Sequence, residues 1–112
     1  MNYSQHGLAR LIRAISDPNR AKILLLLAEG PNYPSIIAEE LGLSKTNVSN
    51  HLSCLVGCGF LQTESQGRRV QYSLIDDSIG ANLIDLTKHV SKLPATQCCC
   101  SCCTEAEAKK EA

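Results

Sequence analysis

The sequence is poor in aromatic residues, has no long apolar run and carries no net charge. It contains no Trp, one Phe and three Tyr in 112 residues, so its core must consist mainly of Leu, Ile, Val and Ala, which suits packed helices. Eleven basic residues balance eleven acidic ones, which excludes an overall electrostatic attraction to nucleic acid or anionic membranes. No run approaches the roughly 18 apolar residues of a membrane span, and a signal-peptide pattern is lacking. We therefore expect a cytosolic chain.

Cysteine, by contrast, is abundant and unevenly placed. The chain has seven cysteines, and five of them fall within residues 98–103. In a reducing compartment, an odd and crowded set of this kind fits a disulfide framework poorly. Metal binding or thiol chemistry is therefore the leading interpretation of the cysteines.

Apolar residues recur at helical spacing in five segments, and two short segments before the last of them favour strands. Helices are predicted for residues 5–16, 20–28, 33–41, 45–57 and 79–93, and strands for residues 60–64 and 70–74. Asp17 before Pro18 predicts a capped helix start with Pro18 at the first helical position, and Ser44 predicts another cap. Residues 66–68 are expected to form the turn between the strands.

The order of these segments predicts a mainly α fold with a small β-hairpin, namely a winged helix-turn-helix. Residues 33–41 and 45–57 form the helix-turn-helix, and the hairpin forms the wing. The last helix has an apolar face that could pair with the first helix of a second subunit, so we expect a dimer. Residues 1–94 are expected to form one DNA-binding and dimerisation domain, and residues 95–112 a cysteine-rich mobile tail without bulky apolar anchors.

The candidate DNA-reading surface is the polar face of the helix over residues 45–57. If Val48, Leu52 and Leu55 point inward, the outer arc carries side chains that can donate to phosphates and base edges in the major groove. Two arginines at the wing tip are placed to reach the backbone or the minor groove. The candidate residues are Lys45, Thr46, Asn47, Ser49, Asn50, His51, Ser53, Arg68 and Arg69. The alternative is that these side chains are simply solvated.

The candidate metal ligands begin with Cys54 and Cys58, whose sulfurs stand one turn apart on a helix and can bind the same ion. Further thiols are available in the tail, at Cys98, Cys99, Cys100, Cys102 and Cys103. Thiolate sites suit soft or borderline ions such as Cd(II), Pb(II), Hg(II), As(III), Zn(II) or Cu(I). Alternatively, Cys54 and Cys58 are small buried hydrophobic residues. The three histidines, His6, His51 and His89, are weaker ligand candidates.

Two stretches of the chain resemble the ArsR/SmtB family of metal-responsive repressors. They are Ser16-Asp17-Pro18-Asn19-Arg20 and Leu43-Ser44-Lys45-Thr46-Asn47-Val48-Ser49-Asn50-His51-Leu52-Ser53-Cys54-Leu55, and the resemblance covers about residues 5–93. The segment over residues 47–59 is similar to the cadmium- and lead-sensing members. The resemblance implies a homodimer joined by the first and last helices, which binds operator DNA when metal-free. In this subgroup it implies a site of three thiolates, with Cys54, Cys58 and a tail cysteine of the other subunit, Cys98 or Cys99 by spacing.

The resemblance also implies where other metal sites of the family would lie. One of them needs cysteines where this chain has residues 33–36, which contain none. A zinc site on the last helix is matched by Asp76 and His89, but Ser78 and Lys92 stand where further ligands are needed. The extra tail cysteines depart from the simple three-thiolate pattern. Cd(II) or Pb(II) is therefore the expected inducer, with Zn(II), Hg(II) and As(III) as alternatives.

The residues do not predict an enzyme, because no nucleophile, base and orienting group can be placed together. The favoured hypothesis is a cytoplasmic repressor that releases its operator when a soft ion binds at the end of the recognition helix. A repressor that senses redox state or persulfide through the same thiols is one alternative. A metal-buffering protein, with the helices as a scaffold, is the alternative from another class.

Overall fold

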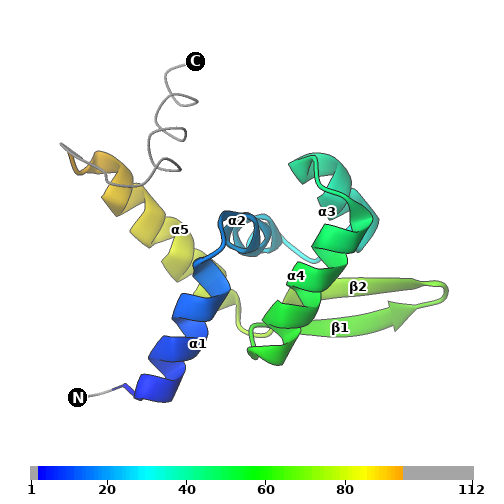
Figure 1. The fold of residues 1–112 in the computed structure, drawn as a ribbon, viewed down its shortest axis with the longest axis horizontal. Coiled ribbons are helices and arrows are strands. Elements are labelled where there is room, and N and C mark those ends of the chain that lie inside the picture. The colour runs from blue at the N-terminus through cyan, green and yellow to red at the C-terminus, as the bar shows by residue number, and fades with distance from the viewer. Residues whose placement is uncertain (1–2, 95–112) are drawn as a thin grey trace.

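The computed structural model describes residues 3–94, which form five helices and one antiparallel hairpin (Figure 1). In chain order the elements are α1 (Gln5–Ile15), α2 (Pro18–Leu27), α3 (Pro34–Leu41), α4 (Lys45–Gly57), β1 (Leu61–Gln66), β2 (Arg69–Leu74) and α5 (Asp77–Lys92). The helices and strands predicted from the sequence are thus present. None of the helices in this range is long and apolar enough to cross a membrane. The predicted tail over residues 95–112, with its five cysteines, lies outside the described residues, so the domain boundary stays a prediction.

Polar caps and a proline set the ends of the helices. Asp17 caps α2 by accepting hydrogen bonds from two backbone N–H groups, of which that of Asn19 lies at 2.8 Å. Ser44 caps α4 by accepting from the N–H of Asn47 at 3.1 Å. Both predicted caps are confirmed. The helix α2 begins at Pro18, the first helical position that the Asp17-Pro18 pair predicted, where no backbone N–H is needed.

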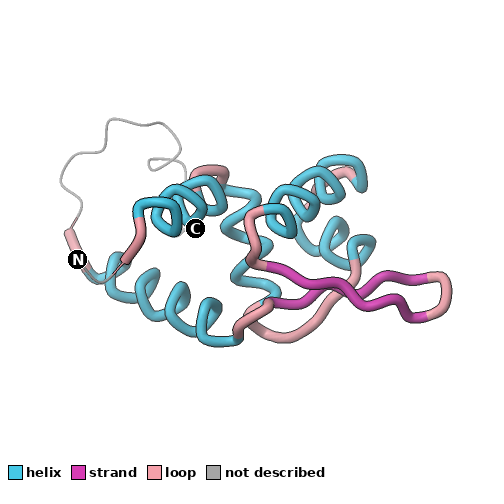
Figure 2. The backbone as a smooth tube through the Cα atoms, turned by 90° about the horizontal axis from the view of Figure 1, so that it is seen from below, coloured by secondary structure: helices cyan, strands magenta, loops and turns pink. Residues whose placement is uncertain are grey.

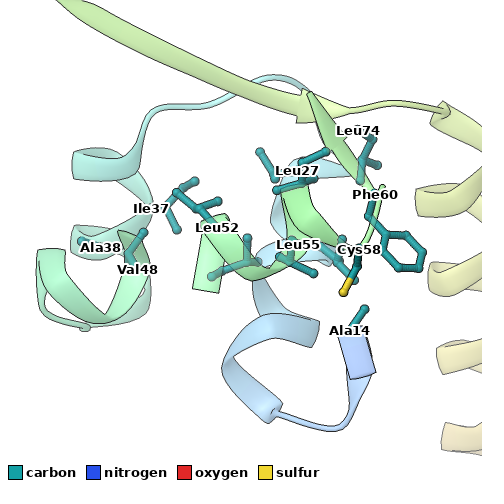
Figure 3. Close-up of a cluster of buried hydrophobic side chains, with 13 residues drawn as sticks. Ala14, Leu27, Ile37, Ala38, Val48, Leu52, Leu55, Cys58, Phe60 and Leu74 are labelled. Atoms are coloured by element: carbon teal, nitrogen blue, oxygen red, sulfur yellow. The ribbon is translucent and has the colours of Figure 1, made fainter. Parts of the chain in front are cut away.

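The hydrophobic core lies between α2, α3, α4 and the base of the hairpin (Figure 3). Val48, Leu52 and Leu55 of α4 have no exposed surface, as their helical spacing predicted. They belong to a cluster whose other large members are Ile23, Leu24, Leu27, Ile37, Phe60, Leu61 and Leu74. Because burying one such side chain contributes about 1.5–3 kcal/mol, this stripe fixes the face of α4 that turns outward.

The wing is the hairpin of β1 and β2, which extends away from the helices (Figure 2). The strands pair in antiparallel register up to Gln66 with Arg69, so that Gly67 and Arg68 alone form the turn. Both strands are longer than predicted, because Gln66 joins the ladder instead of the turn. Gly67 has a φ of 65°, the left-handed conformation that two-residue hairpin turns require.

A backbone bridge ties the wing to the helix-turn-helix. The N–H of Asn32 donates to the carbonyl of Tyr72 at 2.9 Å, and the N–H of Tyr72 donates to the carbonyl of Asn32 at 2.8 Å. Asn32 lies just before α3, which begins at Pro34. The segment that leads into α3 is therefore fixed to β2, and the wing and helix-turn-helix are held together.

The helices α1 and α5 lie on the side of the molecule away from the wing tip (Figure 1). Both present large apolar side chains to solvent in the single chain; for example, Ile12 is 54% exposed and Val90 is 57% exposed. The others are Leu8 and Leu11 on α1, and Leu86 and Leu93 on and directly after α5. Because contiguous exposed apolar surface marks a site of protein contact, these two helices are the candidate dimer surface.

Gly80 allows α5 to approach α2 and the hairpin closely. A Cβ atom added at Gly80 would lie 2.6 Å from Cβ of Ala28 and 2.8 Å from Cδ1 of Leu74. We expect Gly80→Ala to lower the free energy of unfolding by about 1–3 kcal/mol through overpacking, as measured by urea denaturation at fixed protein concentration. The control is Gly57→Ala in α4, whose added Cβ meets nothing within 4 Å and should not destabilise the chain. Equal stabilities of the two variants would contradict the close packing.

Candidate functional site

The outer face of α4 and the wing tip carry the residues predicted to contact DNA. All but one of them are exposed, namely Lys45, Thr46, Asn47, Ser49, Asn50 and Ser53 on α4, with Arg68 and Arg69 on the wing. A hollow of about 450 Å³ between the start of α3, α4 and the wing is lined by Lys45, Ser49, Arg68 and Arg69 together. Three positive charges around one hollow suit an anionic partner such as a DNA phosphate.

His51, the remaining predicted contact, lies in a different environment. It is half-buried, and its charge acts on the carboxylate of Asp17 at the start of α2. Partial burial works to raise the pKa of Asp17, but the backbone hydrogen bonds from Asn19 and Arg20 and the charges of His51 and Arg20 together lower it. His51 is therefore at the edge of the core near α2, and a contact of His51 with DNA stays a prediction.

Side-chain contacts that the sequence did not predict hold the wing against the start of α3. The guanidinium of Arg69 lies 3.6 Å from the ring centroid of Tyr33. The hydroxyl of Tyr33 donates to Oε1 of Gln66, whose amide donates to Oε1 of Gln71 at 3.1 Å. A cation–π contact at an exposed site contributes about 0.5–1 kcal/mol. Arg69 is thus engaged with Tyr33, while Arg68 sits at the exposed turn.

The thiol pair lies at the end of α4, where the helix meets α1. Cys58 is the C-cap of α4, and its sulfur points toward Ala14 of α1 (Figure 3). It is 6% exposed and belongs to the core cluster, whereas Cys54 is half-buried at the edge of that cluster. Cys58 therefore fills a place in the core as well as standing one helical turn from Cys54.

The charges around Cys58 act in opposite directions. Burial raises the pKa of the Cys58 thiol, and the charge and hydrogen bond of the neighbouring Cys54 raise it further. The guanidinium charges of Arg13 and Arg20 lower it, but the pKa remains above its usual value. Cys58 is therefore protonated at neutral pH, and binding of a metal ion by its sulfur has to release a proton.

Two thiols one turn apart suit a soft ion, but they do not complete a site. Within residues 3–94, no group of three His, Cys, Asp or Glu side chains is placed to hold a metal ion. Protein zinc sites, for example, use three or four protein ligands. Because the tail cysteines lie outside the described residues, their part in such a site stays a prediction.

The two residues that match a last-helix zinc site have other partners. Asp76 caps α5 by accepting hydrogen bonds from the N–H and the hydroxyl of Ser78 at 2.9 and 2.7 Å. The hydroxyl and N–H of Ser78 lower the pKa of Asp76. Nε2 of His89 lies 3.5 Å from Oδ2 of Asp85 on the same helix. The third histidine, His6, is exposed on α1. Within residues 3–94, neither Asp76 nor His89 belongs to a group of three possible metal ligands.

A helix-turn-helix followed directly by a β-hairpin, with a polar outer face on its second helix, defines a winged-helix transcriptional regulator. The chain belongs to the ArsR family of bacterial regulatory proteins, whose family model matches residues 17–63. It is 44% identical over 95 residues to the HTH-type transcriptional regulator CmtR of Mycobacterium tuberculosis. The matched region covers 85% of this chain and 80% of that protein. The family resemblance inferred from the sequence is therefore confirmed.

Solved structures and a further relative extend this comparison. The NMR structure of the cadmium metal-sensor CmtR from Mycobacterium tuberculosis matches with a TM-score of 0.64 at 44% identity, over 83% of this chain and 97% of that one. A probable mercury resistance operon repressor of Streptomyces lividans is 36% identical over 93 residues, 81% of this chain and 74% of the relative. A homodimeric winged helix-turn-helix domain of Mycobacterium bovis shares the fold, with a TM-score of 0.72 at 21% identity over 88% and 96% of the two chains.

The burial and raised pKa of Cys58 predict unequal reactivity of the two described thiols. At neutral pH we expect iodoacetamide to modify Cys54 about tenfold faster than Cys58, because burial raises the pKa of the Cys58 thiol and restricts access to its sulfur. The ratio should fall as the pH rises above the ordinary thiol value of 9.0, where Cys58 begins to ionise. Fragment-ion mass spectrometry distinguishes the two positions, and the unfolded protein is the control. Equal rates in the folded protein would refute the prediction.

The contact between Arg69 and Tyr33 predicts that Tyr33 steadies the wing. Tyr33→Leu removes the ring, and the loss of about 0.5–1 kcal/mol should speed amide hydrogen exchange over residues 66–71 about two- to fivefold. Tyr33→Phe is the matched control, because it keeps the ring under Arg69 and loses only the hydroxyl that donates to Gln66. If the leucine variant exchanged at the wild-type rate, the stacking would have no part in holding the wing.

Proposed function

We propose that this protein is a metal-responsive transcriptional repressor that binds operator DNA as a homodimer in the metal-free state. Capture of a soft metal ion by cysteine thiolates releases the DNA. The observation that carries the proposal is the position of Cys54 and Cys58 on α4 itself, the helix whose outer face carries the candidate DNA contacts, with Cys58 as its C-cap. An ion held by this pair acts directly on the helix that reads DNA.

The DNA contacts follow from the exposed face of α4. In a winged helix-turn-helix the second helix of the motif enters the major groove, and here its exposed Lys, Asn, Ser and Thr side chains are donors for base edges and phosphates. The hollow lined by Lys45, Arg68 and Arg69 receives the phosphate backbone beside that groove.

Dimerisation is supported by the apolar side chains that α1 and α5 expose. The large apolar side chains of this candidate dimer surface are each more than one third exposed in the single chain. Contact with a second copy of the chain would remove them from water. The homodimeric Mycobacterium bovis domain has the same fold. Two copies joined in this way present two α4 helices to successive major grooves.

The ligand set is Cys54, Cys58 and one tail cysteine of the partner subunit. Spacing favours Cys98 or Cys99 as the third ligand, with Cys100, Cys102 and Cys103 as further thiols. The ion supplies a soft Lewis acid that holds three thiolates together and so draws the tail to the end of α4. Cd(II) or Pb(II) is the favoured ion, and the similarity to the cadmium metal-sensor CmtR supports Cd(II). Hg(II), As(III) and Zn(II) suit the same donors.

Metal capture lowers DNA affinity by favouring a dimer in which the two α4 helices no longer match successive grooves. By linkage, operator DNA weakens ion binding by the same factor, and such couplings are typically about 1–3 kcal/mol. Because Cys58 loses a proton when it binds the ion, the affinity for metal rises with pH up to the raised pKa of Cys58.

Operator binding followed by fluorescence anisotropy at fixed salt tests the proposal. Cd(II) or Pb(II) should release the wild-type protein, and a panel of Zn(II), Hg(II), As(III) and Cu(I) ranks the other ions. Cys54→Ser, Cys58→Ser and a chain that ends at Pro94 should bind operator normally when metal-free but lose most of a coupling of about 1–3 kcal/mol. The tail variant Ser101→Ala is the control, because it removes no thiol.

Three outcomes would contradict the proposal. Full ion response in Cys58→Ser would separate this thiol from the switch. Release by peroxide or polysulfide that dithiothreitol reverses and Cd(II) does not reproduce would favour the redox or persulfide sensor. Failure to bind DNA from its own promoter region, with metal binding retained, would favour a metal-buffering protein. Thiolate-to-metal absorption reports the number of sulfur ligands in each case.

A further inference from the structure

Arg10 connects α1 directly to the end of α4. Its Nε donates a hydrogen bond to the backbone carbonyl of Cys58 at 2.8 Å, across 48 positions of sequence. The main packing of α1 is against α2, so this hydrogen bond is a separate link from α1 to the residue that caps the DNA-reading helix. The residue that accepts it is also one of the two described thiols.

The turn after α4 is shaped to receive the Arg10 guanidinium. Gly59 has a φ of 87°, and a Cβ atom added there would lie 2.5 Å from Nη2 of Arg10. Glycine therefore meets two requirements at once, the left-handed backbone and the close approach of the side chain. The carbonyl of a helix C-cap has no partner within its own helix, and Arg10 provides one for Cys58.

Arg10 also borders the candidate dimer surface. Together with its neighbour Leu11, it lines a groove of about 360 Å³ between α1 and α5, to which Leu83 and Leu86 also contribute. Leu11 and Leu86 are among the exposed apolar residues of that surface. One side chain thus contacts the end of α4 and borders the surface through which two copies are proposed to meet.

We infer that Arg10 is a positioning residue that links Cys58 to α1. When an ion binds at Cys58, Arg10 transmits the displacement of the turn to α1, and the movement of α1 changes the arrangement of the two subunits. This inference rests on the proposed function. Because Cys58 is 6% exposed, its sulfur reaches an ion shared with a tail ligand only if the turn that carries it shifts. The Cys58 carbonyl shifts with the same turn, and its bond to Arg10 displaces α1.

The test compares two arginines of the same helix. Arg10→Met removes the donor and the charge and keeps the length of the chain, whereas Arg13→Met removes an equal charge that also acts on Cys58 but leaves the bond from Arg10 to the carbonyl. Operator affinity is measured by anisotropy for each full-length dimer with and without Cd(II). Cd(II) stoichiometry and thiolate-to-cadmium absorption are recorded in parallel.

In the wild type, Cd(II) should weaken operator binding roughly 5- to 150-fold. In Arg10→Met this ratio should fall to within about threefold of unity, with metal-free operator affinity, Cd(II) stoichiometry and absorption unchanged. Arg13→Met should retain the wild-type ratio. A full ratio in Arg10→Met, or an equal loss in both variants, would overturn the inference while leaving the proposed function in place. A wild type that ignores every ion of the panel would overturn the proposed function, and the role of Arg10 with it.

A second measurement needs no substitution and so does not depend on the folding of a variant. Amide hydrogen exchange of residues 5–15 in the wild-type dimer is compared with and without Cd(II), in the absence of DNA. The inference predicts a change of protection in α1 on Cd(II) binding. Release of operator with α1 protection unchanged would overturn it.

Discussion

The burial of three aliphatic side chains on one side of α4 decides where every other residue of that helix points. Val48, Leu52 and Leu55 have no exposed surface, and each further position turns by about 100° around the helix axis. The polar side chains are thereby directed to solvent, Cys54 lies at the edge of the core, and Cys58 lies within it. A helix that slipped in register would misplace the candidate DNA-contacting residues and both thiols together.

The local features of this fold could be predicted, because they depend on neighbours in sequence. Helical periodicity located the helices, and Asp17 and Ser44 marked two of their starts. The contacts that join distant positions could not be predicted. The bond from Arg10 to Cys58 and the stacking of Arg69 on Tyr33 both depend on how helices and strands dock, which periodicity does not encode. The strand lengths were underestimated because a two-residue turn and a three-residue turn differ only in the pairing of Gln66.

The spacing of Cys54 and Cys58 placed both thiols on one face, but it did not distinguish a ligand from a core residue. The structure places Cys58 in the core cluster with its sulfur beside Cys54, and its role as a metal ligand stays a prediction. The positive charges of Arg13 and Arg20 oppose the cost of ionising a buried thiol. Burial raises the pKa of the Cys58 thiol, and the charges of the two arginines limit that rise. A strongly binding ion can then displace the thiol proton.

The pairing of Asn32 with Tyr72 limits the kinds of motion that are open to this regulator. Two backbone hydrogen bonds join the approach to α3 with a strand of the wing, so the hairpin cannot swing independently of the helices beside it. In the proposed mechanism, a displacement of α1 or of the end of α4 therefore turns the wing and the helix-turn-helix together. In the proposed dimer, the distance and angle between the two units of wing and helix-turn-helix, rather than the shape of either unit, then determine whether both fit an operator.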